Sequence, residues 1–233
     1  MFNRFFALSV CAALAFAPAV ASAQTANPAP TTYAYGPAGQ PISPIAGGLL
    51  GSYSKSMQSG TIAAGLAANS PVFSLRYGGT GIAVIRRISV SVAGTATAFA
   101  AGNATLQVFN ARAFTASDSG GTAGTLTGNN GKLRTSLATT GVSSIQIANT
   151  GTLTAGTRTL DSDPLAGVTL AVGTATSTQL LNNTTLYEPG QAGDYPLELA
   201  TNEGFVIQAN VPATGTWLLQ VRVDWEEYSA FAP

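Results

Sequence analysis

The sequence contains no histidine, and its single cysteine, Cys11, lies in the apolar N-terminal stretch. Histidine is the side chain most often used for general acid–base catalysis near neutral pH, and it is also the commonest metal ligand. One cysteine forms neither a disulfide within the chain nor a thiolate zinc site. These absences exclude histidine- and cysteine-based catalysis, and we predict a protein with no catalytic residues, no cofactor and no enzyme activity.

Charged residues are also scarce, at 9% of the chain against about 25% in an average soluble domain. Ten basic and ten acidic residues give a formal net charge of zero, so bulk charge draws the chain neither to nucleic acid nor to an anionic membrane. The hydrophobic content of 45% is enough to bury a sizeable core. Low charge suits a crowded, assembled or extracellular setting.

Residues 1–23 have the three parts of a secretory signal peptide: Arg4 in a basic start, an apolar run over 5–17, and Ala21-Ser22-Ala23 as a cleavage site. Cleavage after Ala23 predicts a secreted mature chain without cysteine and without a stable membrane span. Two alternatives stay open, namely an uncleaved membrane anchor and an apolar arm that remains attached inside a virion.

Residues 24–50 form a Pro- and Gly-rich linker or arm. Proline fixes φ and lacks a backbone donor, which disfavours helices and sheet interiors. We expect an extended arm with polyproline character that acts as a flexible spacer; anchoring on a neighbouring subunit through Tyr33 and Tyr35 is the alternative. Five of the twelve prolines lie here: Pro28, Pro30, Pro37, Pro41 and Pro44.

From residue 51 onward, apolar and polar residues alternate with the period of two that half-buried strands show. In the clearest strand, Trp217, Leu219, Val221, Val223 and Trp225 share one face, so both tryptophans are expected in the core. Similar alternations occur at 88–92, 104–114 and 205–211.

Glycine-rich turns separate these segments, and Asn130-Gly131 predicts a two-residue hairpin turn. Many short strands with such turns favour an all-β fold. We therefore predict a single antiparallel β-sandwich or jelly-roll-like domain over residues 51–233, preceded by the N-terminal arm.

Asp161 and Asp163 are weak candidates for a metal site, because alternate carboxylates in a turn could bind calcium. A calcium site needs about six oxygen ligands, and no third acid lies nearby in the sequence. A turn before Pro164, in which the aspartates bond their own backbone, is the main interpretation.

Other charged and aromatic residues give weaker signals. Consecutive Arg86 and Arg87 point to opposite faces of a strand, so we expect one of them in an ion pair or an interface. Residues 226–227, both glutamate, are interpreted as a solvated strand end. Tyr187 and Tyr195 are candidates for stacking on a surface glycan.

Four segments, at 113–123, 126–135, 155–161 and 202–217, resemble uncharacterised structural proteins encoded by tailed phages and prophages. The resemblance covers about residues 50–228. It implies a virion role in head decoration or in the tail, and it carries over no catalytic residues. The secretion signal departs from this pattern, because virion proteins assemble in the cytoplasm.

Two hypotheses of different classes follow. The first is a non-enzymatic structural subunit of a virion or virus-like extracellular assembly, whose partners are further copies or neighbouring subunits. The second is a secreted surface binding module of the carbohydrate-binding or adhesin type.

Overall fold

The computed structural model describes residues 48–63, 65–66, 68–174, 179–190 and 195–230, all of which belong to one compact unit, Tyr33–Pro233. The signal-peptide prediction for residues 1–23 and the arm prediction up to residue 47 lie outside the described residues. The first strand begins at Leu49, just before the predicted end of the arm.

Thirteen strands and no helix occur in the described ranges, which confirms the all-β prediction. No helix in this part of the chain is long and apolar enough to span a membrane. The strands are β1 (Leu49–Gln58), β2 (Ile62–Ala63), β3 (Ser70–Tyr77), β4 (Ile82–Gly94), β5 (Gly102–Ala116), β6 (Thr122–Ala123), β7 (Val142–Ile147), β8 (Thr157–Leu160), β9 (Ala166–Val172), β10 (Gln179–Tyr187), β11 (Leu197–Leu199), β12 (Glu203–Asn210) and β13 (Thr216–Tyr228).

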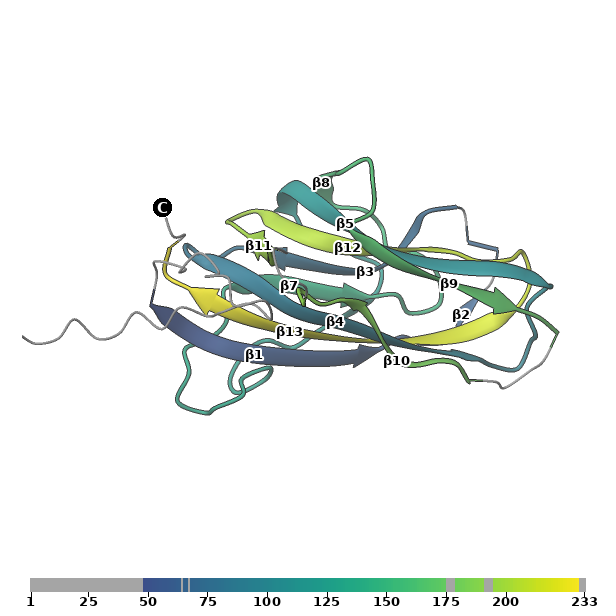
Figure 1. Ribbon diagram of the computed structural model, residues 1–233, viewed down its shortest axis with the longest axis horizontal. Coiled ribbons are helices and arrows are strands. Elements are labelled where there is room, and N and C mark those ends of the chain that lie inside the picture. The colour runs from purple at the N-terminus through teal and green to yellow at the C-terminus, as the bar shows by residue number, and fades with distance from the viewer. Residues whose placement is uncertain (1–47, 64, 67, 175–178, 191–194, 231–233) are drawn as a thin grey trace, which may run out of the picture. The chain divides into compact units, whose positions relative to one another are not determined.

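These strands form two antiparallel sheets that pack face to face, which confirms the β-sandwich (Figure 1). The first sheet has the order β1-β13-β4-β10, with β11 also paired to β4 and β2 to β13. The second sheet has the order β6-β7-β3-β12-β5-β8, with β9 also paired to β5. The consecutive strands β12 and β13 lie in different sheets, so the turn between them carries the chain across the sandwich.

The core lies between the sheets and follows the alternation of the sequence. Trp217, Leu219, Val221, Val223 and Trp225 are at most 1% exposed, which confirms the predicted face of β13. The second sheet contributes alternating apolar residues of β5 and β12 to the same core. Burial of apolar area at roughly 25 cal/mol per Å² is the main term that holds the sandwich together.

The predicted hairpin at Asn130-Gly131 is wrong. Gly131 does have a left-handed backbone conformation, at φ 81°. The paired strands on either side of it are β6 and β7, however, and residues 124–141 form the long connection between them instead of a two-residue turn. We call this connection the 124–141 loop. Its leucines do not alternate with polar residues, so the segment has no face suited to a paired strand.

The 124–141 loop covers the outer edge of β1. The Ser54 amide donates to the carbonyl of Gly131 at 2.7 Å, and the Leu133 amide donates to that of Ser52 at 3.3 Å. The Tyr53 hydroxyl donates to the Ala138 carbonyl at 3.1 Å. These bonds occupy backbone groups that an edge strand otherwise leaves open to pairing with another chain.

A small second core lies apart from the main one and consists of Ala111, Phe114 and Val206, with Leu160 packed against them. Strand β12 pairs with β3 on one side and with β5 on the other. Its residue Val206 points away from the main core, whereas the neighbours Phe205 and Ile207 point into it. The outer face of the second sheet is therefore partly buried as well.

Candidate functional site

A groove of about 40 Å³ lies between β5, β11 and β12. Strand β11 pairs with β4 in the first sheet, whereas β5 and β12 pair in the second, so the groove lies where the two sheets face each other. Its lining residues are Asn110, Ala111, Arg112, Leu197, Glu198, Leu199, Glu203 and Gly204. This set combines apolar residues with four polar or charged side chains, those of Asn110, Arg112, Glu198 and Glu203.

The Asn110 side chain supplies an unused acceptor at this groove. Its Nδ2 donates to Asp161 Oδ2 at 3.2 Å, which fixes the orientation of the amide. Its Oδ1 is buried and has no hydrogen-bond partner within the described part of the chain. A buried acceptor without a partner costs about 1–3 kcal/mol, so a donor group from a bound molecule would relieve that cost.

Arg112 organises the charges beside Asn110. Its Nε and Nη2 donate to Asp161 Oδ1 and Oδ2 at 2.8 and 3.1 Å, and its Nη1 lies 3.7 Å from Glu203 Oε1. The hydrogen bond from Arg112 holds the pKa of the Asp161 carboxyl below its usual range. The second oxygen of Glu203 accepts from the Ala200 amide at 2.8 Å.

The weak metal candidates, Asp161 and Asp163, differ in their contacts and in their exposure to solvent. Both oxygens of Asp161 are engaged by Arg112, whereas Asp163 is exposed. No group of three or more His, Cys, Asp or Glu side chains is arranged for a metal in the described ranges. A turn before Pro164 stays the main interpretation of this pair, and calcium binding stays the untested alternative.

Two tyrosines lie close to β11, although neither is among the lining residues of the groove. The Leu197 amide donates to the Tyr187 hydroxyl at 2.5 Å, and Tyr195, two residues before Leu197, is 80% exposed. The structure therefore brings both sequence-predicted glycan candidates to the strand that lines the groove. The two tryptophans are elsewhere and buried, as predicted.

The expectation of an ion pair at residues 86–87 is confirmed for Arg86. Its Nε and Nη2 donate to Glu226 Oε2 at 2.8 and 2.5 Å, and the Tyr228 hydroxyl donates to the same oxygen at 2.8 Å. Glu198 lies near this pair; burial raises the pKa of its carboxyl, and the charge of Arg86 partly offsets the rise.

The interpretation of residues 226–227 as a solvated strand end is wrong, most clearly for Glu227, which is 3% exposed. Its carboxylate accepts from the Thr140 hydroxyl, from the Gly141 amide at 2.9 and 3.0 Å, and from Trp225 Nε1 at 3.0 Å. Neutral donors thus stabilise this buried charge and tie the end of the 124–141 loop to β13. Its position two residues after Trp225, on the same strand face, is the signal that could have predicted burial.

The same burial raises the pKa values of two tyrosines next to Glu227. Desolvation, followed by the charge of Glu227, raises the pKa of Tyr53 and raises that of Tyr77 to about 12. The Tyr53 ring stacks on Trp225 with centroids 5.5 Å apart. This end of the sandwich is a tightly packed polar and aromatic cluster rather than an open site.

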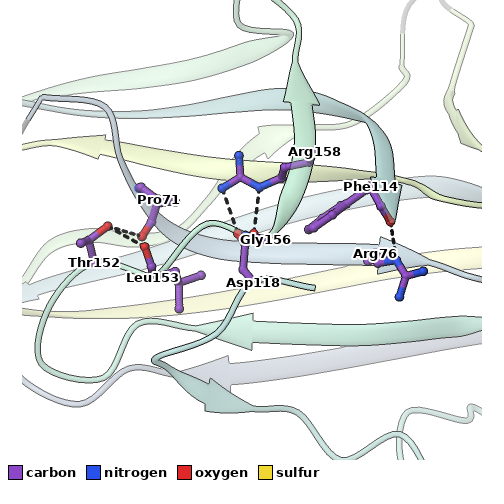
Figure 2. Close-up of polar contacts among 8 residues, drawn as sticks. All are labelled: Pro71, Arg76, Phe114, Asp118, Thr152, Leu153, Gly156 and Arg158. Atoms are coloured by element: carbon purple, nitrogen blue, oxygen red, sulfur yellow. Dashed lines mark hydrogen bonds and ion pairs between the residues drawn. The ribbon is translucent and has the colours of Figure 1, made fainter. Parts of the chain in front are cut away.

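Figure 2 shows a buried ion pair between Arg158 and Asp118, near the Phe114 ring of the small second core. Arg158 Nε and Nη2 donate to Asp118 Oδ1 and Oδ2 at 2.9 and 3.0 Å, and the Gly156 amide donates to Oδ1 at 2.8 Å. The two side chains are only 6% and 0% exposed. The Arg158 guanidinium also lies 5.7 Å from the centre of the Phe114 ring.

This pair joins two segments that are far apart in the sequence, the chain after β5 and the chain before and within β8. Gly156 is required there, because a Cβ atom would lie 2.0 Å from the Ala116 carbonyl oxygen. Arg76 supports the same region by donating to the Phe114 carbonyl (Figure 2). It also donates to Asn202 Oδ1 at 2.8 Å. Sequence reasoning missed the pair, since isolated charges in Gly- and Ser-rich segments show no periodicity.

The described part of the chain therefore forms a two-sheet β-sandwich that has a polar groove between β5, β11 and β12 and buried carboxylates at Asp118 and Glu227. Comparisons with family models, with curated proteins and with solved structures found no match. The resemblance to virion-associated phage proteins stays a prediction that rests on the segments quoted above.

Proposed function

We propose that this protein is a non-enzymatic structural subunit of a virion or virus-like extracellular assembly, of the decoration or tail-associated type. The observation that carries the proposal is the junction between the arm sequence and the sandwich. The Gly48 carbonyl accepts from the Ser229 amide at 3.2 Å, so the chain enters the fold at a fixed point beside the start of β1. A Pro- and Gly-rich segment that starts from a fixed point is suited to reaching a neighbouring subunit.

The sandwich itself supports the same function. Its main core is extensive, its β1 edge is covered, and a buried ion pair fastens the chain over one outer face. A rigid body of this kind keeps its shape while its surface makes contacts with further copies. Closed symmetry is the commonest arrangement of such copies.

Export is part of the proposal, with cleavage after Ala23 and a mature chain in the extracellular space. A virion in which Met1 is retained is the alternative location. N-terminal sequencing of the native protein distinguishes them.

Size-exclusion chromatography with light scattering tests the proposed assembly on the chain that starts at Gln24. The expected mass corresponds to more than one copy and grows with concentration. A strict monomer at high concentration would count against a structural subunit.

A second function, a glycan-binding surface module, is favoured by the groove. Glu203 is suited to accept from sugar hydroxyls and Arg112 to donate to them, Asn110 lines the same groove, and the exposed Tyr195 offers a ring for stacking. A glycan array tests it: binding should be lost in Tyr195→Ala and in Asn110→Leu but kept in Leu133→Ala, which changes an exposed leucine outside the groove. Binding to no glycan would refute this second function.

A further inference from the structure

The sequence contains a single Asn-Gly dipeptide, Asn130-Gly131, and the fold places it in the 124–141 loop. The Lys132 amide donates to the Asn129 carbonyl at 3.2 Å, so the dipeptide forms the centre of a turn. Asn130 is exposed in this turn, and Gly131 has a positive φ of 81°. The backbone nitrogen of a residue after asparagine is a potential nucleophile toward the carbonyl carbon of the asparagine side chain.

The local structure leaves both reacting groups available. The Gly131 amide donates no hydrogen bond within the described part of the chain, so no bond has to break before it loses its proton. Glycine has no Cβ atom, so nothing on residue 131 obstructs the approach of its nitrogen to Asn130 Cγ. The Asn130 side chain is held by one exposed bond, from Nδ2 to the Thr127 carbonyl at 2.7 Å. Such a bond contributes about 0.5–1.5 kcal/mol, which is a small obstacle to rotation of the side chain.

We propose that Asn130 is a site of spontaneous deamidation, with water as the only co-reactant. The Gly131 nitrogen loses its proton and attacks Asn130 Cγ. The new bond closes a succinimide ring, while the bond from Cγ to Nδ2 breaks and ammonia leaves with a proton. Water then adds to one of the two ring carbonyls. Opening at Cγ leaves an aspartyl residue, and opening at the backbone carbonyl leaves an isoaspartyl residue, in which the main chain runs through the former side chain.

The isoaspartyl product alters the hydrogen bonds that cover β1, because it inserts an extra methylene group into the main chain just before Gly131. The Ser54 amide donates to the Gly131 carbonyl at 2.7 Å, and the next residue, Lys132, forms an antiparallel bridge with Tyr53. Hydrogen bonds weaken steeply when their distance and angle change. The longer main chain therefore weakens the bond to Ser54 and leaves a backbone donor of the β1 edge open to pairing with another chain.

Both products also change the charge of the loop. Lys132 and Arg134 are the only charged residues in the 124–141 loop, so its formal charge is +2. A new carboxylate at position 130 lowers this charge to 2 − 1 = +1, beside Lys132. The modified chain is therefore more acidic than the unmodified chain, and anion-exchange chromatography separates the two.

Peptide mapping by mass spectrometry, with the full chain sampled during incubation at mildly alkaline pH, tests the site. We expect Asn130 to deamidate about tenfold faster than Asn129 and Asn183, which are also exposed but are not followed by glycine. Asn130→Gln should abolish the acidic species, and the matched control Asn129→Gln should retain it. Comparable rates at the three asparagines, or an acidic species that persists in Asn130→Gln, would overturn the site.

Hydrogen exchange tests the effect on β1 in the acidic fraction, whose isoaspartyl content is measured by labelling with an isoaspartyl methyltransferase. The Ser54 amide should exchange faster in proportion to that content. Asn130→Asp adds the charge without lengthening the main chain, so it should keep the protection of Ser54. Thermal unfolding confirms that each sample is folded. Unchanged exchange at Ser54 in the acidic fraction, or equal loss of protection in Asn130→Asp, would overturn the effect assigned to the longer main chain.

Discussion

At the scale of single residues, the two buried tryptophans of β13 pack alike but differ in hydrogen bonding, so a comparison of them isolates the contribution of a hydrogen bond. Trp217 and Trp225 are each 1% exposed and lie on the same core face. Trp225 Nε1 donates to Glu227 at 3.0 Å and lies 3.3 Å from the Thr140 hydroxyl. Trp217 Nε1 is buried without a hydrogen-bond partner among the described residues.

We therefore expect Trp225→Phe to destabilise the fold more than Trp217→Phe does. Both changes remove similar apolar volume, but only the first deprives a buried carboxylate of a donor, which costs about 1–3 kcal/mol more. Urea denaturation of the two variants measures the difference. Equal losses of unfolding free energy would show that the indole bond to Glu227 contributes nothing.

The raised pKa of Tyr77 makes the stability of the fold depend on pH. Its pKa is raised from 10.0 to about 12, so the folded state disfavours the phenolate that the unfolded chain forms more readily. The stability that this group contributes is fully present below pH 10 and is lost as the pH rises toward 12. The pKa values of Tyr53 and Tyr228 are raised as well, so Tyr77→Phe should reduce, without abolishing, the phenolate absorbance that develops above pH 10. Titration of every tyrosine near pH 10 in the folded protein would contradict this.

At the scale of elements, two ion pairs differ mainly in burial. Asp118 and Arg158 are almost fully buried, whereas the side chains of Arg222 and Asp224 are 55% and 23% exposed. Removing one partner of a buried pair leaves an uncompensated charge. An exposed pair is screened by water, and its loss costs little.

Asp118→Ala should lower the unfolding free energy by about 3–5 kcal/mol, because Arg158 would be left buried without its partner. The control Asp224→Ala should change it by less than about 1 kcal/mol. Chemical denaturation of both variants provides the comparison. A loss in Asp118→Ala no larger than that in the control would mean that the pair does not fasten the loop segments to the second sheet.

The elements differ in how far they could be predicted from the sequence. The strand faces at 217–225 and 205–211 were predictable, because alternation is a local property that burial imposes directly. The edge cover by the 124–141 loop and the pairing of Asp118 with Arg158 depend on contacts between distant segments, which no local pattern encodes. The region of the groove was partly predictable. Tyr187 and Tyr195 were predicted as ligand-binding candidates from their side-chain chemistry, but Asn110 and Arg112 line the groove only because β5 faces β11, which the sequence does not reveal.

At the scale of the whole molecule, a charge-poor sandwich is combined with a covered β1 edge. With a net charge of zero, long-range attraction contributes little to finding a partner, so short-range apolar contact has to provide the affinity. We expect the resulting association to depend only weakly on salt.

Native mass spectrometry of the protein isolated from its source tests the structural function most directly, because one spectrum reports both the N-terminus and the number of copies. A structural subunit predicts complexes of two or more copies, each beginning at Gln24 after export or at Met1 inside a particle. A spectrum that contains only the single-copy mass, at every concentration and in every fraction, would contradict it.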